Sequence, residues 1–148
     1  SLDPTAELRE VRLHLGSAQD HYPGFDNWFD RKVIPGLGTT RTILTQRNDR
    51  GICGIAIAKR DVAEQKLCTL WVNPSCRTQG VARSLAEAAF DWLGTSRPLF
   101  TVPDGLIDQF RGLLRLWSFE PCERVVGAYR DGSVEHVFNG SLRERLLT

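Results

Sequence analysis

The stretch from Leu70 to Leu93, LWVNPSCRTQGVARSLAEAAFDWL, decides the fold. A strand-like run stops at Asn73-Pro74, and apolar residues at helical spacing predict an amphipathic helix from about Gly80 onward. A helix start needs only a capping side chain, yet small residues, Gly80 and Ala82, stand at this one. Free N–H groups and the helix dipole favour a phosphate there. The stretch predicts a strand, a loop and a helix whose entrance binds an anion, with Arg77 adding charge or ordering the loop.

Strands and helices are predicted on both sides of this stretch. Alternating residues or turn chemistry predict strands at 11–15, 41–46, 52–59, 66–72, 99–102, 123–130 and 133–138. Helices are predicted at about 25–34, where Phe25, Phe29 and Val33 share one face, at 80–93, and at 104–117 with Asp104 as its cap. This order predicts an α+β fold with a mixed, mostly antiparallel sheet of about seven strands and flanking helices.

Composition sets the class of protein. The length of 148 residues predicts one domain over 1–148, and 41% hydrophobic with 25% charged residues is typical of a globular protein. The formal net charge of +1 argues weakly against a nucleic-acid partner. The four cysteines lack metal-ligand spacing, so we expect no metal and reduced thiols in a cytoplasmic protein. Since no long apolar run is present, we expect no membrane partner.

The pattern Arg77-x-x-Gly80-x-Ala82, after a strand and an Asn-Pro turn, resembles the acyl-CoA signature of the GNAT superfamily of N-acetyltransferases. That pattern is Gln or Arg, two residues, Gly, one residue, then Gly or Ala. The later LLRLWSFEP, residues 113–121, resembles the family's closing helix and Phe-containing turn. The element order fits from about Val11 to Phe138. The resemblance implies acetyl-CoA as co-substrate and two central parallel strands that splay apart.

The resemblance also implies a coenzyme A site. Backbone N–H groups of Thr78 to Ala82 would hold the pyrophosphate. The pantetheine arm would lie along the strand edge at Leu70 to Val72, facing the strand at 99–102, and Arg83 could meet a phosphate. The expected site comprises Leu70, Trp71, Val72, Arg77, Thr78, Gln79, Gly80, Val81, Ala82 and Arg83.

The residues depart from the family at its usual catalytic positions. Leu114 stands where many members have a tyrosine acid, Ile107 replaces a frequent asparagine, and Cys68 replaces a common strand carboxylate. The general acid and base are therefore unknown. Substitutes on the acceptor side could be Tyr129, His21 and Tyr22, whereas His14 and His136, both expected on strands, are interpreted as structural.

The resulting expectation is an N-acetyltransferase that acts on a primary amine of a small molecule or peptide by direct attack. Two alternatives stay open: a non-catalytic coenzyme A-binding module that docks to a protein, and a transferase for a nucleic-acid amine. Acceptor contacts are expected from 20–37 and the closing hairpin. The protein is expected to be a monomer or a homodimer.

Overall fold

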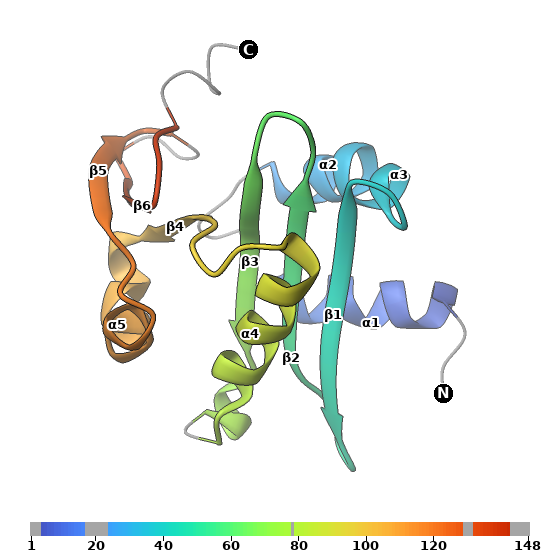
Figure 1. Ribbon diagram of the computed structural model, residues 1–148. Helices are drawn as coiled ribbons and strands as arrows, with labels where there is room; N and C mark the ends of the chain where they lie inside the picture. The colour runs from blue at the N-terminus through green and yellow to red at the C-terminus, as the bar shows by residue number, and fades with distance from the viewer. Residues whose placement is uncertain (1–3, 17–23, 78, 129–131, 143–148) are drawn as a thin grey trace.

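One six-stranded sheet organises the computed structural model, which describes residues 4–16, 24–77, 79–128 and 132–142 (Figure 1). The strands are β1 (Arg41–Asn48), β2 (Gly51–Arg60), β3 (Gln65–Val72), β4 (Leu99–Pro103), β5 (Pro121–Val126) and β6 (Val134–Phe138). They lie in the order β1-β2-β3-β4-β6-β5. Neighbouring strands are antiparallel except β3 and β4, which are parallel. The predicted α+β fold with a mixed, mostly antiparallel sheet is confirmed.

Helices cover both faces of the sheet. On one face lie α1 (Pro4–Leu15) and a continuous helical segment made of α2 (Phe25–Trp28), a π-helical turn (Phe29–Val33) and α3 (Ile34–Gly36). On the other lie α4 (Val81–Leu93) and α5 (Ile107–Leu116), each preceded by a 3-10 turn, at Pro74–Cys76 and Asp104–Leu106. In Figure 1, α4 crosses in front of the β1–β3 half and α1 lies behind it.

The strand predicted at 11–15 is wrong, because these residues end α1. Val11, Leu13 and Leu15 alternate in the sequence, but Val11 and Leu15 are fully buried while Leu13 is 79% exposed. Leu8 packs beside the buried pair, so the buried positions follow helical spacing. His14 therefore lies on a helix. The sheet has six strands in the described part of the chain, not seven.

The aromatic segment after α1 forms the predicted helical face. Phe25, Phe29 and Val33 are buried against the sheet, one turn apart. Arg12 of α1 ties this segment down through ion pairs with Asp26 and Asp30. Phe25 and Phe29 are thus core residues, and only Trp28 of the aromatics described here keeps a partly exposed ring.

Helix α4 lies close to the sheet because β2 presents a glycine beneath it. A Cβ at Gly54 would come within 2.6 Å of Val81 and 2.7 Å of Leu85. Both side chains belong to the buried face of α4. The absence of a side chain at Gly54 therefore sets the depth at which α4, and with it the predicted anion site, sits on the strands.

The central strands β3 and β4 separate soon after they begin. They pair only at Lys66–Leu99 and Leu67–Phe100, after which β3 continues beside β2 and β4 continues beside β6. Figure 1 shows β4, β5 and β6 lying with α5 to one side of β1, β2 and β3. The predicted splay is confirmed, and the edge of β3 from Cys68 to Val72 has no strand partner on its β4 side among the described residues.

None of the described helices has the length and apolar character needed to cross a membrane.

Candidate functional site

The entrance of α4 is an open turn at the end of β3. Asn73 organises it, because its side-chain oxygen accepts a hydrogen bond from the Ser75 N–H at 3.1 Å and its carbonyl accepts one from Cys76 N–H at 2.8 Å. Gly80 then precedes α4 with φ of +77°, a left-handed conformation that glycine adopts without strain. Apart from its two chain neighbours, no described residue has an atom within 4 Å of the position a Cβ would take there. The described residues therefore leave space open beside the first N–H groups of α4.

The expected coenzyme A residues divide into a loop and a strand edge. Arg77, Gln79, Gly80 and Arg83 are exposed, Ala82 is half-buried and Val81 is buried, whereas Thr78 lies outside the described residues. On β3 the side chains of Leu70 and Val72 pack in the core under α4. Trp71 points to the opposite face, where its ring centroid lies 5.1 Å from that of His14. A ligand along β3 would therefore meet backbone groups.

Arg83 has a partner on its own helix. Its Nε lies 3.0 Å from Oε2 of Glu87, one turn further along α4. The same carboxylate oxygen accepts a hydrogen bond from Trp117 Nε1 at 3.4 Å. Arg83 can reach a phosphate only by leaving this exposed ion pair, which is worth little in water.

Two buried cysteines, Cys53 of β2 and Cys76, fix the position of the loop between β3 and α4. Cys76 donates a hydrogen bond to the Cys53 sulfur, with 2.8 Å between the Sγ atoms, and both residues are nearly inaccessible. Asn48 Nδ2 lies 3.7 Å from the Cys76 sulfur. Cys76 therefore anchors the residue before Arg77 to β1 and β2.

The family's usual catalytic positions hold no acid or base here. Leu114 is only 7% exposed and packs in the core, and Ile107 is half-buried beside it. Cys68 is half-buried at the point where β3 leaves β4, and burial raises the pKa of its thiol, which keeps it neutral. The candidates Tyr129, His21 and Tyr22 lie outside the described residues.

Asp104 and His136 form a pair that the sequence did not reveal. Asp104 does not cap the helix that follows it; its Oδ1 instead lies 2.6 Å from Nε2 of His136. His136 stands opposite Val102 in the β4–β6 ladder, two residues before Asp104, so strand register brings the two together. The hydrogen bond with His136 lowers the pKa of Asp104, with His136 and Arg124 adding electrostatic attraction. The pair lies at the end of β4, the strand that borders the gap.

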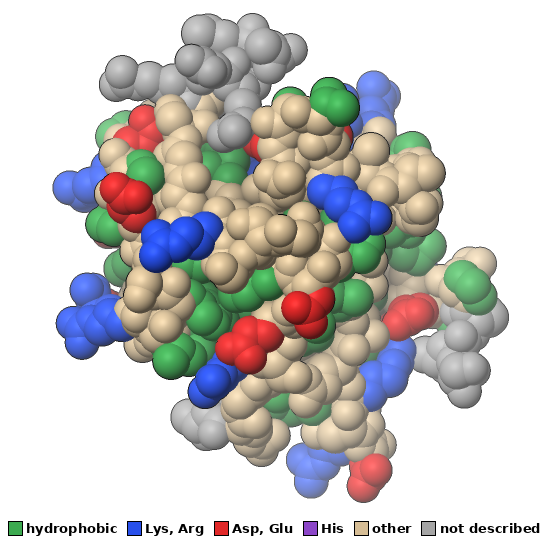
Figure 2. Space-filling view, viewed as in Figure 1, with side chains coloured by type: hydrophobic (Ala, Val, Ile, Leu, Met, Phe, Trp, Pro, Cys, Tyr) green, Lys and Arg blue, Asp and Glu red, His purple; other side chains and the backbone are tan. Residues whose placement is uncertain are grey.

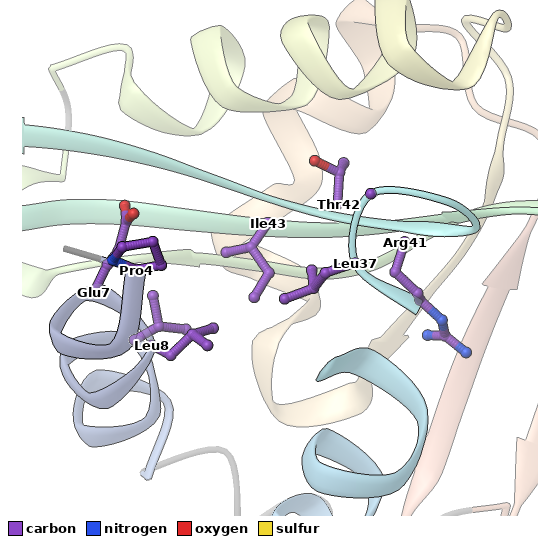
Figure 3. A pocket seen from close by; sticks show the side chains of 9 residues that line it. Pro4, Glu7, Leu8, Leu37, Arg41, Thr42 and Ile43 are labelled. Carbon is purple, nitrogen blue, oxygen red and sulfur yellow. The ribbon is translucent and has the colours of Figure 1, made fainter. Parts of the chain in front are cut away.

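A hollow of about 210 Å³ lies elsewhere, between α1 and the start of β1 (Figure 3). In Figure 3, Leu8, Leu37 and Ile43 point toward one another across it, and the Arg41 guanidinium extends away from it. Its lining is mostly apolar and it does not include β3 or β4. It is not part of the strand gap.

Charges are mixed on the face that carries α4. Figure 2 shows Lys and Arg side chains interleaved with Asp and Glu, without a field of one sign on the described part of this face. This distribution matches the formal net charge of +1. The described residues on this face form no basic stripe of the kind that tracks a nucleic-acid backbone.

At the level of sequence, no family model and no curated protein matches this chain. Solved structures do match its fold. Nourseothricin acetyltransferase superposes with a TM-score of 0.60 at 17% identity, covering 67% of this chain and 64% of its own. The ribosomal-protein-S18-alanine N-acetyltransferase from Escherichia coli gives 0.59 at 17% identity and 70% coverage of each chain.

An aminoglycoside 6'-N-acetyltransferase complexed with coenzyme A superposes with a TM-score of 0.54 at 9% identity, covering 68% of this chain and 72% of its own. Further matching structures carry the GNAT family name. The match spans less than two thirds of nourseothricin acetyltransferase. At these identities the likeness establishes the fold, and the chain has the GNAT fold.

Proposed function

We propose that this chain, which has the GNAT fold, transfers an acetyl group from acetyl-CoA to a primary amine of a small molecule or a peptide. One observation carries the proposal: β3 and β4 part after two paired positions, and the edge of β3 without a strand partner then leads, through the loop after Val72, to an open helix entrance. Unpaired strand edges need hydrogen-bond partners when they are covered. The amides of a pantetheine arm supply such partners, and the N–H groups at the start of α4 suit its pyrophosphate.

The loop before α4 suits this co-substrate because small residues stand at the helix start and a positive charge stands nearby. Gly80 leaves open space beside the helix start, and Ala82 is small. Exposed Arg77 adds positive charge to the same loop. These features let a diphosphate approach the backbone closely, whereas a larger side chain at Gly80 would occupy that space.

The chemistry is direct attack by the amine on the thioester carbon. The amine nitrogen forms a bond to the carbonyl carbon, the carbon–sulfur bond breaks, and the thiolate leaves with a proton drawn from the amine or from solvent. A covalent acetyl-cysteine route is disfavoured, because burial raises the pKa of Cys68 and so keeps the thiol protonated. We propose the Asp104–His136 pair as the proton-transfer group, because it is a titratable pair at the end of β4.

A second candidate function is a coenzyme A-binding module without turnover. The buried Leu114 and the neutral Cys68 at the usual catalytic positions favour it. An acceptor screen separates the two functions: thiol release from acetyl-CoA is followed over pools of small amines, peptides and RNA. Release above the hydrolysis background in an amine or peptide pool supports the transferase. Tight acetyl-CoA binding without release in any pool supports the module.

A further inference from the structure

Arg41, the first residue of β1, is a buried cation without a carboxylate partner in the described part of the chain. Only 8% of the residue is exposed. Its Nη1 lies 3.6 Å from the Cys68 sulfur, and its Cζ lies 5.6 Å from the centroid of the Trp28 ring. Each described ion pair joins other residues.

This environment leaves most of the guanidinium unsatisfied. A guanidinium carries five N–H donors, and a neutral thiol is a weak acceptor for one of them. Burial raises the pKa of Cys68, so its thiol brings no negative charge. Part of the Arg41 residue, 8%, is still exposed to solvent. A ligand can therefore approach the donors that the Cys68 thiol leaves unused.

The Arg41 guanidinium lies close to the point where β3 and β4 separate. Cys68 follows Leu67, the last residue of β3 that pairs with β4. Figure 3 shows the Arg41 side chain extending away from the hollow beside α1. Its contacts with Cys68 and Trp28 place it on the α1 and α2 face, opposite α4. The cation lies where the strands part, on the face across the sheet from the open helix entrance.

We propose that Arg41 binds an oxyanion, a carboxylate or a phosphate, carried by the amine acceptor. The inference rests on the proposed acetyl transfer and names the class of acceptor. A planar guanidinium pairs with a carboxylate or phosphate through two parallel hydrogen bonds. The Trp28 ring lies beside the guanidinium, with 5.6 Å from Cζ to the ring centroid. An incoming anion would supply the countercharge that no described carboxylate provides.

Selectivity between matched acceptors tests this site. Thiol release from acetyl-CoA is compared for α-amino acids, their neutral amides and amines that carry a phosphate. The wild type should prefer an anionic pool by at least about 10-fold, and Arg41→Gln should remove the preference with a loss of about 10- to 100-fold. Arg41→Lys keeps the positive charge but cannot form two parallel hydrogen bonds with one anion. Its preference for anionic acceptors should lie between those of the wild type and Arg41→Gln. Arg60→Gln is the control, because Arg60 also stacks on a tryptophan, Trp92 at 4.2 Å, but beside α4.

A binding readout separates this inference from the transferase activity. The Nε–H NMR signal of Arg41, identified by its loss in Arg41→Lys, is followed on addition of N-acetylglycine, inorganic phosphate or neutral N-acetylglycinamide. Saturable shifts with one or both anions and none with the amide support the site, and the anion that shifts the signal identifies its class. If no acceptor is acetylated, the proposed acetyl transfer is wrong. The NMR shifts still show in that case whether Arg41 binds an anion. Equal response to all three probes, or no response, overturns it, as does equal use of charged and neutral acceptors.

Discussion

His136 and Asp104 lie 32 residues apart in the chain, and their Nε2 and Oδ1 atoms are 2.6 Å apart. The β4–β6 register creates this contact by setting His136 opposite Val102. Hydrogen bonding to His136 lowers the pKa of Asp104 below its ordinary value of 3.8. The contact therefore stabilises the folded state at pH values above that ordinary pKa. This stabilisation is lost as the pH falls through the lowered pKa of Asp104. At neutral pH the carboxylate is fully charged.

Replacing His136 tests its role in proton transfer. His136→Gln should lower kcat about 100-fold, because general acid–base groups typically contribute that much or more. The dissociation constant of acetyl-CoA, measured by calorimetry, should stay within about twofold. The matched control is His14→Gln, since His14 lies on α1 against Trp71 and not beside β4. A kcat unchanged in His136→Gln would assign the pair a structural role only.

Cys68 should be dispensable for the chemistry. Burial raises the pKa of its thiol, so the nucleophilic thiolate is scarce at neutral pH. Cys68→Ala should keep kcat within about fivefold, and mass spectrometry of wild-type protein with acetyl-CoA alone should detect no acetyl-enzyme. Alkylation at pH 8.5 should be slower at Cys68 than at exposed Cys122. An acetylated Cys68 peptide together with an inactive Cys68→Ala variant would require a covalent route.

A tyrosine cannot simply be restored on α5. Leu114 is 7% exposed within the core, so Leu114→Tyr should lower the free energy of unfolding by about 1–3 kcal/mol through overpacking. Leu116→Tyr on the same helix, where the leucine is 51% exposed, should change it by less than about 0.5 kcal/mol. Urea unfolding measures both. Equal stability of the two variants would mean that the space at Leu114 is open, as a tyrosine acid requires.

Alanine should have opposite effects on stability at two glycines, Gly54 of β2 beneath α4 and Gly112 of α5. Gly54→Ala should lower the free energy of unfolding by about 1–3 kcal/mol, because its Cβ would meet Val81 and Leu85 within 2.7 Å. Gly112 lies on the exposed side of α5, where a Cβ would meet no atom of the described residues within 4 Å beyond its own helix backbone and chain neighbours. Gly112→Ala should therefore stabilise the fold by about 0.5–1 kcal/mol. Thermal unfolding of both variants checks the signs. A neutral Gly54→Ala would show that α4 is not held at this depth.

Local patterns predicted most of the fold. The Asn73-Pro74 stop, the helical spacing after Gly80 and the turn residues of the β1–β2 hairpin act through neighbours in the chain, and their elements appear where expected. The segment 11–15 failed because five residues alternate equally well on a strand and on a helix end. Only packing against the sheet selects the helix.

The site was predictable only where it depends on the backbone. The open entrance of α4 follows from Gly80 and its sequence context. The Asp104–His136 and Arg41–Cys68 contacts instead join strands and loops far apart in the chain. Both depend on strand register and sheet order, which residue spacing does not reveal.

Binding of acetyl-CoA tests the central claim most directly, through two glycines at the ends of α4. Gly80 and Gly94 have φ of +77° and +76°, and, chain neighbours aside, a Cβ at either would meet no atom of the described residues within 4 Å. Valine at either position should therefore cost similar stability, about 1–2 kcal/mol. Calorimetry should give micromolar affinity for the wild type, at least about 10-fold weaker binding for Gly80→Val, and affinity within about twofold of wild type for Gly94→Val. Equal affinities of Gly80→Val and Gly94→Val, or no binding by the wild type, would contradict the assignment of the α4 entrance as the coenzyme A site.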